Sequence, residues 1–191
     1  MVSPGSRNAP LVLALHHHPD IAVHVTIDER AAAHHALGLA LATWTPVPVV
    51  CTSGTAALNH GPALAEAFHA RIPLLSITAD RPQDVVGRGH GQTLTQTGVH
   101  AAHVVHHDVL DESIMDVKTL TQRARQALHR WREDPDSPQV PCTSMCLSTS
   151  PCTISPLLLT FLKPKEMRRG TPKRMAWRCL KHWPIAWPVV V

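Results

Sequence analysis

The chain has 191 residues, of which 44% are hydrophobic and 17% are charged, and its formal net charge is +4. This length suits one ordinary domain, and the apolar content is enough for a buried core, which excludes a wholly disordered chain. No run reaches the roughly 18 apolar residues that a membrane-spanning helix needs, and no basic segment leads into an apolar one as in a secretory signal. We therefore expect a cytoplasmic protein.

Up to about residue 133, short apolar or β-branched runs alternate with helical patterns. In chain order, the sequence predicts a strand at 22–27, a helix at 28–43, a strand at 46–51, a helix at 52–70, a strand at 73–78, a helix at 93–102, a strand at 103–108 and a helix at 111–131. Asp28 is expected to cap the first of these helices. Alternating strands and helices with short connections form a parallel sheet covered by helices, so the predicted fold class is α/β.

Polar motifs lie where the predicted strands end. Residues 3–8 follow the stub of a first strand, residues 28–30, 52–55 and 80–82 follow the next three strands, and residues 89–93 precede another helix. Ligands of parallel sheets bind at this edge, where free N–H groups and helix dipoles favour negative charge. Because a dipole contributes only about 0.3–1 kcal/mol, an arginine must supply most of the attraction. These motifs predict a small carboxylate or phosphate ligand.

Four of these motifs also carry a resemblance to a known family. They read SPGSRNAP at 3–10, DER followed by ALGLA at 28–40, CTSGTAA at 51–57, and ADRP at 79–82 with GQT at 91–93. In this order and spacing they resemble the N-terminal pyrimidine-binding domain of the 2-succinyl-5-enolpyruvyl-6-hydroxy-3-cyclohexene-1-carboxylate synthases. These are thiamine-diphosphate enzymes of menaquinone and phylloquinone biosynthesis. The resemblance covers residues 1–138, which form only the first domain of a much longer enzyme.

The resemblance implies a thiamine-diphosphate-dependent transferase that decarboxylates 2-oxoglutarate and adds the succinyl unit to isochorismate. The residue matching the family's catalytic glutamate is Glu29, which bonds the aminopyrimidine ring of the cofactor and promotes its reactive tautomer. Thr52, Ser53 and Gly54 match a loop near that ring. Mg²⁺ binds the diphosphate through a C-terminal domain that this chain lacks, so no metal ligand is expected here.

The substrate side of the site follows from the same resemblance. Arg7, Arg81 and Gln92 match positions that bind the carboxylates and hydroxyl of isochorismate, and Ser6 belongs to the same loop. The complete enzyme is expected to be a homo-oligomer, because the cofactor lies between domains of two subunits. The chain starts just before SPGSR, where the family has a helix and most of a strand, so we expect a fragment that is inactive alone.

Histidine is plentiful, with 14 of 15 histidines before residue 133. The runs at 16–18, 34–35 and 103–107 invite a metal interpretation. None of them has a Cys/His spacing typical of structural zinc, and no acidic partner recurs with them. We therefore interpret most of these histidines as surface residues.

The last 53 residues differ in character from the rest. Residues 1–138 carry 10 basic and 13 acidic residues, a net charge of −3, whereas residues 139–191 carry 8 basic and one acidic, a net charge of +7. Four of the five cysteines, Cys142, Cys146, Cys152 and Cys179, also lie there. Back-translation of 139–155 with a shifted frame permits GPVHLNVPLDEPLYHL, a strand and exit like those of the family. We interpret 139–191 as an irregular, frameshifted basic tail without a domain.

Two alternatives stay open from the sequence. The first is a fragment of another thiamine-diphosphate enzyme, of the acetolactate synthase or 2-oxoacid decarboxylase type, although SPGSR with ADRP favours isochorismate. The second is a non-enzymatic basic interaction protein built on the run 163–181 with its tryptophans. The prolines of that run prevent a long amphipathic helix, and we expect neither a nucleic-acid partner nor a membrane span.

Overall fold

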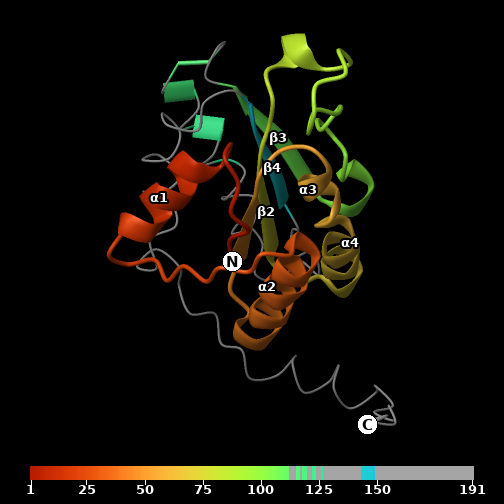
Figure 1. Ribbon diagram of the computed structural model, residues 1–191. Helices are drawn as coiled ribbons and strands as arrows, with labels where there is room; N and C mark the ends of the chain where they lie inside the picture. The colour runs from red at the N-terminus through yellow and green to blue at the C-terminus, as the bar shows by residue number, and fades with distance from the viewer. Residues whose placement is uncertain (112–114, 117, 120–121, 124–125, 127–142, 149–191) are drawn as a thin grey trace, which may run out of the picture.

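The protein contains one parallel sheet, shown in the computed structural model of Figure 1. The structure describes residues 1–111, 115–116, 118–119, 122–123, 126 and the backbone of 143–148. Within these residues, four strands lie in the order β1-β2-β4-β3, and all neighbouring pairs are parallel. The strands are β1 (Val47–Cys51), β2 (Leu74–Ala79), β3 (His106–Asp111) and β4 (Thr143–Ser148). The predicted α/β class with a parallel sheet is confirmed.

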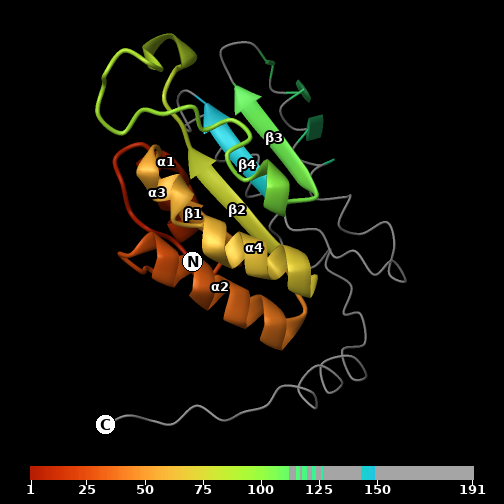
Figure 2. The same cartoon turned by 90° about the vertical axis from the view of Figure 1, so that its right-hand side faces the viewer.

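Helices cover both faces of this sheet (Figures 1 and 2). On one side lies α1 (Ala9–His17), and on the other lie α2 (Glu29–Thr43), α3 (Thr55–Leu58) and α4 (Gly61–Ala70). The core between α2, α4 and the sheet is rich in small side chains, among them Ala32, Ala33, Ala36, Ala40, Ala63 and Ala67. Small side chains let the two helices lie close to each other and to β1. In the described part of the chain, no helix combines the length and hydrophobicity required to cross a membrane.

The elements at 28–43, 46–51 and 73–78 form within one residue of their predicted bounds. The helix α2 starts where expected because Oδ1 of Asp28 accepts a hydrogen bond of 2.7 Å from the amide of Ala31, which satisfies a free N–H of the first turn. All six residues of β2 are buried. Burial of every residue is expected of a strand with helices on both faces, and the two hydroxyl residues of β2, Ser76 and Thr78, bond to His60 and Gln96.

The predicted strand at 22–27 is wrong in extent. Only Val25 forms a bridge there, and its partner is Val2. Two backbone bonds flank that bridge, from the amide of Val2 to the carbonyl of His24 and from the amide of Thr26 to the carbonyl of Val2. Because only Val2 pairs with residues 24–26, the ladder of hydrogen bonds does not extend beyond these two bonds. Val25 is 62% exposed and Ile27 is 83% exposed.

The predicted continuous helix at 52–70 divides into α3 and α4. The break falls at Asn59 and His60, directly before Gly61 and Pro62. Pro62 has no N–H to donate to the carbonyl of Leu58, the last residue of α3, and its ring would clash with that carbonyl in a continuous helix. Proline in the first turn of α4 fits, because that N–H has no helical acceptor. The break also directs His60 into the interior, where it is fully buried.

The predicted helix at 93–102 is wrong. In this stretch the structure has turns and the short 3₁₀ helix η2 (Ala101–His103). The positive φ of Gly98, 73°, interrupts any helix, and the Gln96 side chain is buried in hydrogen bonds with strand ends. The strand predicted at 103–108 forms three residues later, as β3.

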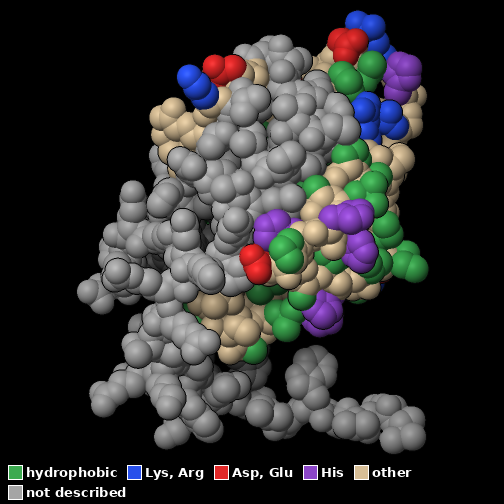
Figure 3. Space-filling view, turned by 90° about the vertical axis from the view of Figure 1, so that its left-hand side faces the viewer, with side chains coloured by type: hydrophobic (Ala, Val, Ile, Leu, Met, Phe, Trp, Pro, Cys, Tyr) green, Lys and Arg blue, Asp and Glu red, His purple; other side chains and the backbone are tan. Residues whose placement is uncertain are grey.

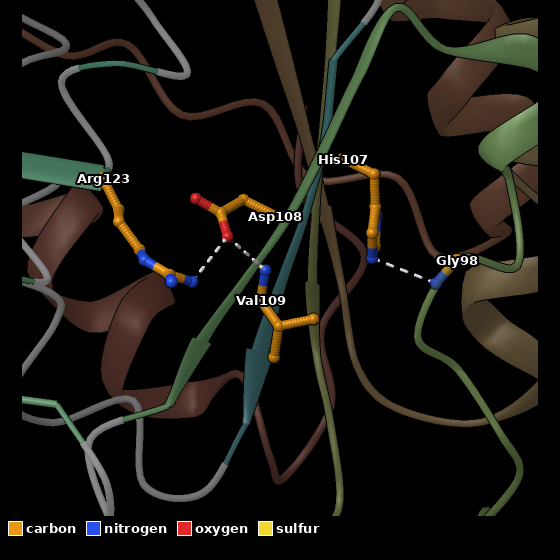
Figure 4. A network of polar contacts seen from close by, with 5 residues as sticks. All are labelled: Gly98, His107, Asp108, Val109 and Arg123. Atoms are coloured by element: carbon orange, nitrogen blue, oxygen red, sulfur yellow. Dashed lines mark hydrogen bonds and ion pairs between the residues drawn. The ribbon is translucent and has the colours of Figure 1, made fainter.

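Figure 4 shows that two successive residues of β3, His107 and Asp108, make polar contacts on opposite sides of the strand. Asp108 accepts a hydrogen bond of 3.1 Å from Nη1 of Arg123 and one of 2.9 Å from the amide of Val109. On the opposite side of the strand, Nε2 of His107 accepts a bond of 3.0 Å from the amide of Gly98. Of the helix predicted at 111–131, the described residues 118–119, 122–123 and 126 are helical, and the others from 127 on lie outside the described residues.

The expectation of an irregular tail is wrong for residues 143–148. They form β4, which pairs with both β2 and β3 through the centre of the sheet. Without a strand between them, β2 and β3 would leave two rows of backbone N–H and C=O groups unpaired in the interior, which is costly. Any segment that can extend in parallel satisfies both rows. The remaining tail, including Cys142, Cys152 and the run 163–181, lies outside the described residues.

Candidate functional site

The loops predicted to form a site leave the sheet at one edge. Val2 forms parallel bridges to both Val25 and Val50, so the segment 1–3 lies between 24–26 and β1. With β2 on the other side of β1, the parallel order places four chain exits side by side. These exits are the loops 3–8, 27–29, 52–54 and 80–82. Ligands of parallel sheets bind at this edge.

The loop at 3–8 packs against two neighbouring exits. The Ser3 hydroxyl donates a 2.8 Å hydrogen bond to the carbonyl of Thr26. A Cβ at Gly5 would lie 2.5 Å from the Cβ of Thr52, so only glycine permits this approach. Asn8, fully buried, donates to the carbonyl of Ser3 at 2.9 Å, and its Oδ1 has no partner in the described residues. The loop then enters α1.

The predicted substrate residues of this loop lie at its surface. Ser6 is exposed and Arg7 is half-buried, directly before the first turn of α1. This turn contains no acidic residue, and its N–H groups have no helical acceptors. A half-buried guanidinium beside such a turn favours an anionic ligand.

Glu29 is the first residue of α2, and its side chain is half-buried. The neighbouring Asp28 caps the helix, so the cap does not need the Glu29 carboxylate. Within the described residues, this carboxylate has no hydrogen-bond partner. A carboxyl group held at a rigid helix start and free of internal bonds has the capacity to bond a ligand.

The loop at 52–54 is buried and closely packed. Thr52 and Ser53 are 6% and 1% exposed. The Ser53 hydroxyl donates to the carbonyl of Gln92 at 3.3 Å, and the amide of Gly54 donates to Oε1 of Gln96 at 2.9 Å. Gly54 has φ +81°, and a Cβ there would lie 2.9 Å from the Gln92 backbone. The loop 91–92 therefore rests on this glycine.

Arg81 lies at the exit of β2 and reaches the same loop. Its Nη2 donates to the carbonyl of Gly91 at 3.4 Å, and its amide donates to Oδ1 of the buried Asp80 at 2.7 Å. Its Nε is buried without a partner in the described residues. Figure 3 shows basic side chains gathered with an acidic side chain and a histidine at this end of the molecule. Gln92 itself is exposed, with a left-handed φ of 55°.

A second polar cluster lies deeper, under α3 and α4. Nδ1 of His60 is 2.8 Å from Oγ of Ser76, and Nε2 of His100 donates to the carbonyl of Ala57 at 2.8 Å. Burial lowers the pKa of His60 to about 3, and the nearby His100 and the Met1 amino group act in the same direction. Burial also lowers the pKa of His100, although its bond to Ala57 acts the other way. Both imidazoles are therefore neutral at pH 7.

The histidine-rich stretches do not converge on a metal site in the described residues. No group of three His, Cys, Asp or Glu side chains there has the geometry to hold a metal ion. His17 and His34 instead place Nδ1 near the carbonyl four residues earlier in their own helices, at 2.7 Å and 2.9 Å.

A series of contacts connects three of the predicted motifs with one another and with Thr26, two residues before the motif that starts at Asp28. It runs from Thr26 to Ser3, from Gly5 to Thr52, from Ser53 to Gln92, and from Gly91 to Arg81. The sequence interpretation missed two members of this edge, Asn8 and Gln96. The signal for Asn8 was its place directly after SPGSR and before α1, where its side chain bonds the Ser3 carbonyl and makes no cap hydrogen bond. For Gln96, the signal was a second amide side chain shortly after Gln92 in a segment interpreted as a helix.

The chain matches the family model described as thiamine pyrophosphate enzyme, N-terminal TPP binding domain, over residues 1–103. It is 42% identical over 139 residues to a protein of Christiangramia forsetii, 46% over 142 residues to one of Corynebacterium glutamicum, and 58% over 95 residues to one of Roseiflexus castenholzii. These matches cover 70%, 73% and 50% of this chain. All three relatives are named 2-succinyl-5-enolpyruvyl-6-hydroxy-3-cyclohexene-1-carboxylate synthase, which confirms the resemblance predicted from the motifs. The chain spans only 24%, 26% and 16% of their lengths.

Proposed function

Because the chain belongs to the thiamine pyrophosphate enzymes through its N-terminal TPP-binding domain, we propose that it supplies the pyrimidine-binding half of a synthase active site. The proposed reaction decarboxylates 2-oxoglutarate and joins the succinyl unit to isochorismate, in agreement with the names of the relatives. The observation that carries the proposal is the series of contacts from Thr26 to Arg81, which holds three motifs and the segment leading into α2 together at one edge of the sheet.

The residues at this edge fit the pyrimidine part of thiamine diphosphate. Glu29 offers a half-buried carboxyl group without an internal partner, and its protonated form donates to a ring nitrogen. We assign Thr52, Ser53 and Gly54, in the loop at the exit of β1, to contacts with the same ring, and Gly5 packs against Thr52. When bound, the cofactor supplies the site at which the negative charge of a decarboxylating 2-oxoacid is stabilised. Mg²⁺ and the residues that hold the diphosphate belong to the complete enzyme, which we propose to be a homo-oligomer.

We assign Arg7 and Arg81 to the carboxylates of isochorismate and Ser6 and Gln92 to its polar groups. Arg7 lies before the free N–H groups of α1, and the buried Nε of Arg81 has no partner in the described residues. Guanidinium groups bind carboxylates with two parallel hydrogen bonds, so two arginines suit a dicarboxylate. Ser6 and Gln92 are exposed, which leaves their polar atoms free to contact a ligand.

A chimaera tests this function. The stretch of 142 residues matched in the Corynebacterium glutamicum relative is replaced by the matching residues of this chain. We expect the chimaera to consume isochorismate with 2-oxoglutarate, thiamine diphosphate and Mg²⁺, and we expect Glu29→Gln to lower kcat by about 10²–10⁴-fold, the usual contribution of a positioned acid or base.

Glu66→Gln is the matched control, because Glu66 is an exposed carboxylate on α4. It should leave kcat within a factor of two. A chimaera in which Glu29→Gln and Glu66→Gln are equally active would exclude the proposed role of Glu29. If the chimaera folds, binds thiamine diphosphate and decarboxylates 2-oxoglutarate but does not consume isochorismate, the proposed substrate is wrong. The chain would then derive from a thiamine-diphosphate enzyme with another second substrate.

A further inference from the structure

Gln96 connects the exits of two strands from a position outside any helix or strand. Its side chain is 2% exposed. Oε1 accepts from the amide of Gly54 at 2.9 Å, while Nε2 donates to Oγ1 of Thr78 at 2.9 Å and to the carbonyl of Ala79 at 2.7 Å. One side chain thus holds the loop after β1 to the last two residues of β2.

The orientation of this amide follows from its partners. A backbone N–H only donates and a backbone carbonyl only accepts, so Oε1 must face Gly54 and Nε2 must face Ala79. No other uncharged side chain of this length offers an acceptor and two donors together. A glutamate at 96 would keep the acceptor for Gly54 but would place a carboxylate oxygen against the Ala79 carbonyl.

These bonds determine where the loop 91–92 lies. Gly54, held by Gln96, supports the Gln92 backbone so closely that a Cβ would lie 2.9 Å from it. The Gln92 carbonyl receives the Ser53 hydroxyl, and the Gly91 carbonyl receives Nη2 of Arg81. Displacement of Gly54 would therefore move the loop and release the guanidinium of Arg81.

We propose that Gln96 is a positioning residue of the substrate site. Through Gly54 and the loop 91–92, it holds Arg81 and Gln92 in the arrangement that binds a carboxylate and a polar group of isochorismate. This inference rests on the proposed function for its ligand and on the contacts of Gln96 for its mechanism. Gln96 does not touch the substrate, so its loss should weaken binding by disordering the loop.

Amide hydrogen exchange on the full chain, with and without isochorismate, tests the proposal. Gln96→Ala should accelerate exchange at Gly54 by at least tenfold, while exchange at Ile77 in the middle of β2 should stay within a factor of two. In the wild type, isochorismate should slow exchange at Gly91 and Gln92. The isochorismate concentration that gives half of this protection should rise at least tenfold in Gln96→Ala.

The variant Thr95→Ala is the matched control, because Thr95 is the exposed neighbour of Gln96 and should leave both readouts unchanged. Gln96→Glu should keep part of the protection of the Gly54 amide against exchange and should still weaken the binding of isochorismate. Thr78→Val removes one of the three hydrogen bonds of Gln96. It should shift both readouts in the same direction as Gln96→Ala but by a smaller factor. If Gln96→Ala does not fold, the readouts of Thr78→Val test the positioning role instead.

The two proposals fail in different ways. Gly54 exchange that is unchanged in Gln96→Ala would overturn the positioning role, whatever isochorismate does. Accelerated Gly54 exchange with an unchanged isochorismate concentration for half-protection would also overturn it. If the wild type shows no protection by isochorismate while Gln96→Ala still releases Gly54, the proposed substrate is wrong and the positioning role toward isochorismate fails with it.

Discussion

Two hydroxyl side chains of β2, Ser76 and Thr78, lie two residues apart and therefore on the same face of the sheet. Ser76 contacts His60 between α3 and α4, in the middle of the strand. Thr78 contacts Gln96 at the strand end. Both hydroxyls are buried, yet the first bonds the imidazole of a segment between helices, and the second bonds a loop at the ligand edge.

The two hydroxyls therefore stabilise different parts of the molecule, one in the interior under the helices and one at the loops of the candidate site. The mid-strand cluster of His60, Ser76 and His100 is buried, and burial keeps its imidazoles neutral, so its contribution to the stability of the fold should depend on pH. The strand-end cluster of Gln96, Thr78 and Gly54 bonds main-chain groups of loops, so it should respond to ligands. Each prediction below alters one side of this comparison.

The largest expected effect is the acid sensitivity of the mid-strand cluster. The pKa of His60 is about 3 in the folded protein and about 6.5 in the unfolded chain, so the unfolded chain binds the proton more readily. This contribution to stability is complete above pH 6.5 and decreases as the pH falls toward 3. The free energy of unfolding should fall by about 2 kcal/mol between pH 7.5 and pH 5, and the lowered pKa of His100 adds to the loss.

Urea denaturation of the full chain at several pH values measures this effect. His60→Gln, which keeps a neutral hydrogen-bonding side chain near Ser76, should flatten the pH dependence. His24→Gln, at an exposed position, should keep the wild-type slope. A free energy of unfolding that is constant between pH 7.5 and pH 5 would show that His60 is accessible to protons in the folded protein.

The second prediction compares the two hydroxyls directly. Ser76→Ala leaves Nδ1 of His60 buried without its partner, which should cost about 1–3 kcal/mol of unfolding free energy. Thr78→Val keeps the volume, and Nε2 of Gln96 still bonds the Ala79 carbonyl, so its cost should stay near 1 kcal/mol. Urea denaturation at pH 7.5 gives both values. A larger cost for Thr78→Val would mean that the strand end, not the mid-strand cluster, dominates stability.

The elements that were predictable from sequence carry their signals locally. The helix α2 has its cap at Asp28 and its apolar spacing within fifteen residues, and β2 is a short, mostly apolar run that contains no charged residue. The prediction of a helix at 93–102 was wrong because the side chain of Gln96 bonds to Gly54, Thr78 and Ala79, which are distant in the sequence. The strand β4 was not predicted because its own composition suggested an irregular tail. It forms because β2 and β3 would otherwise have unpaired backbone groups between them, which the local sequence does not reveal.

The candidate site divides in the same way. Glu29, Arg7 and Arg81 could be proposed from sequence because each lies in a short motif, and the structure places all three motifs at strand exits. Gln96 and His60 were not, because their roles depend on partners 42 and 16 residues away that only the folded chain brings together. Motifs therefore identify which loops to inspect as a candidate site, whereas the side chains that hold those loops in place are found only from the structure.

The smallest expected effect serves as the baseline for both buried clusters. The ion pair between Asp108 and Arg123, shown in Figure 4, joins β3 to the segment 118–126, with the Arg123 side chain 44% exposed. Arg123→Ala should cost no more than about 1 kcal/mol of unfolding free energy, because solvent screens the pair and ordering a long side chain offsets part of the attraction. A double-mutant cycle with Asp108→Asn, which keeps an acceptor for the amide of Val109, isolates the pair. We attribute the larger cost expected for Ser76→Ala to the burial of its hydrogen bond. A coupling energy between Asp108 and Arg123 as large as that cost would contradict this explanation, because this pair is partly exposed to solvent.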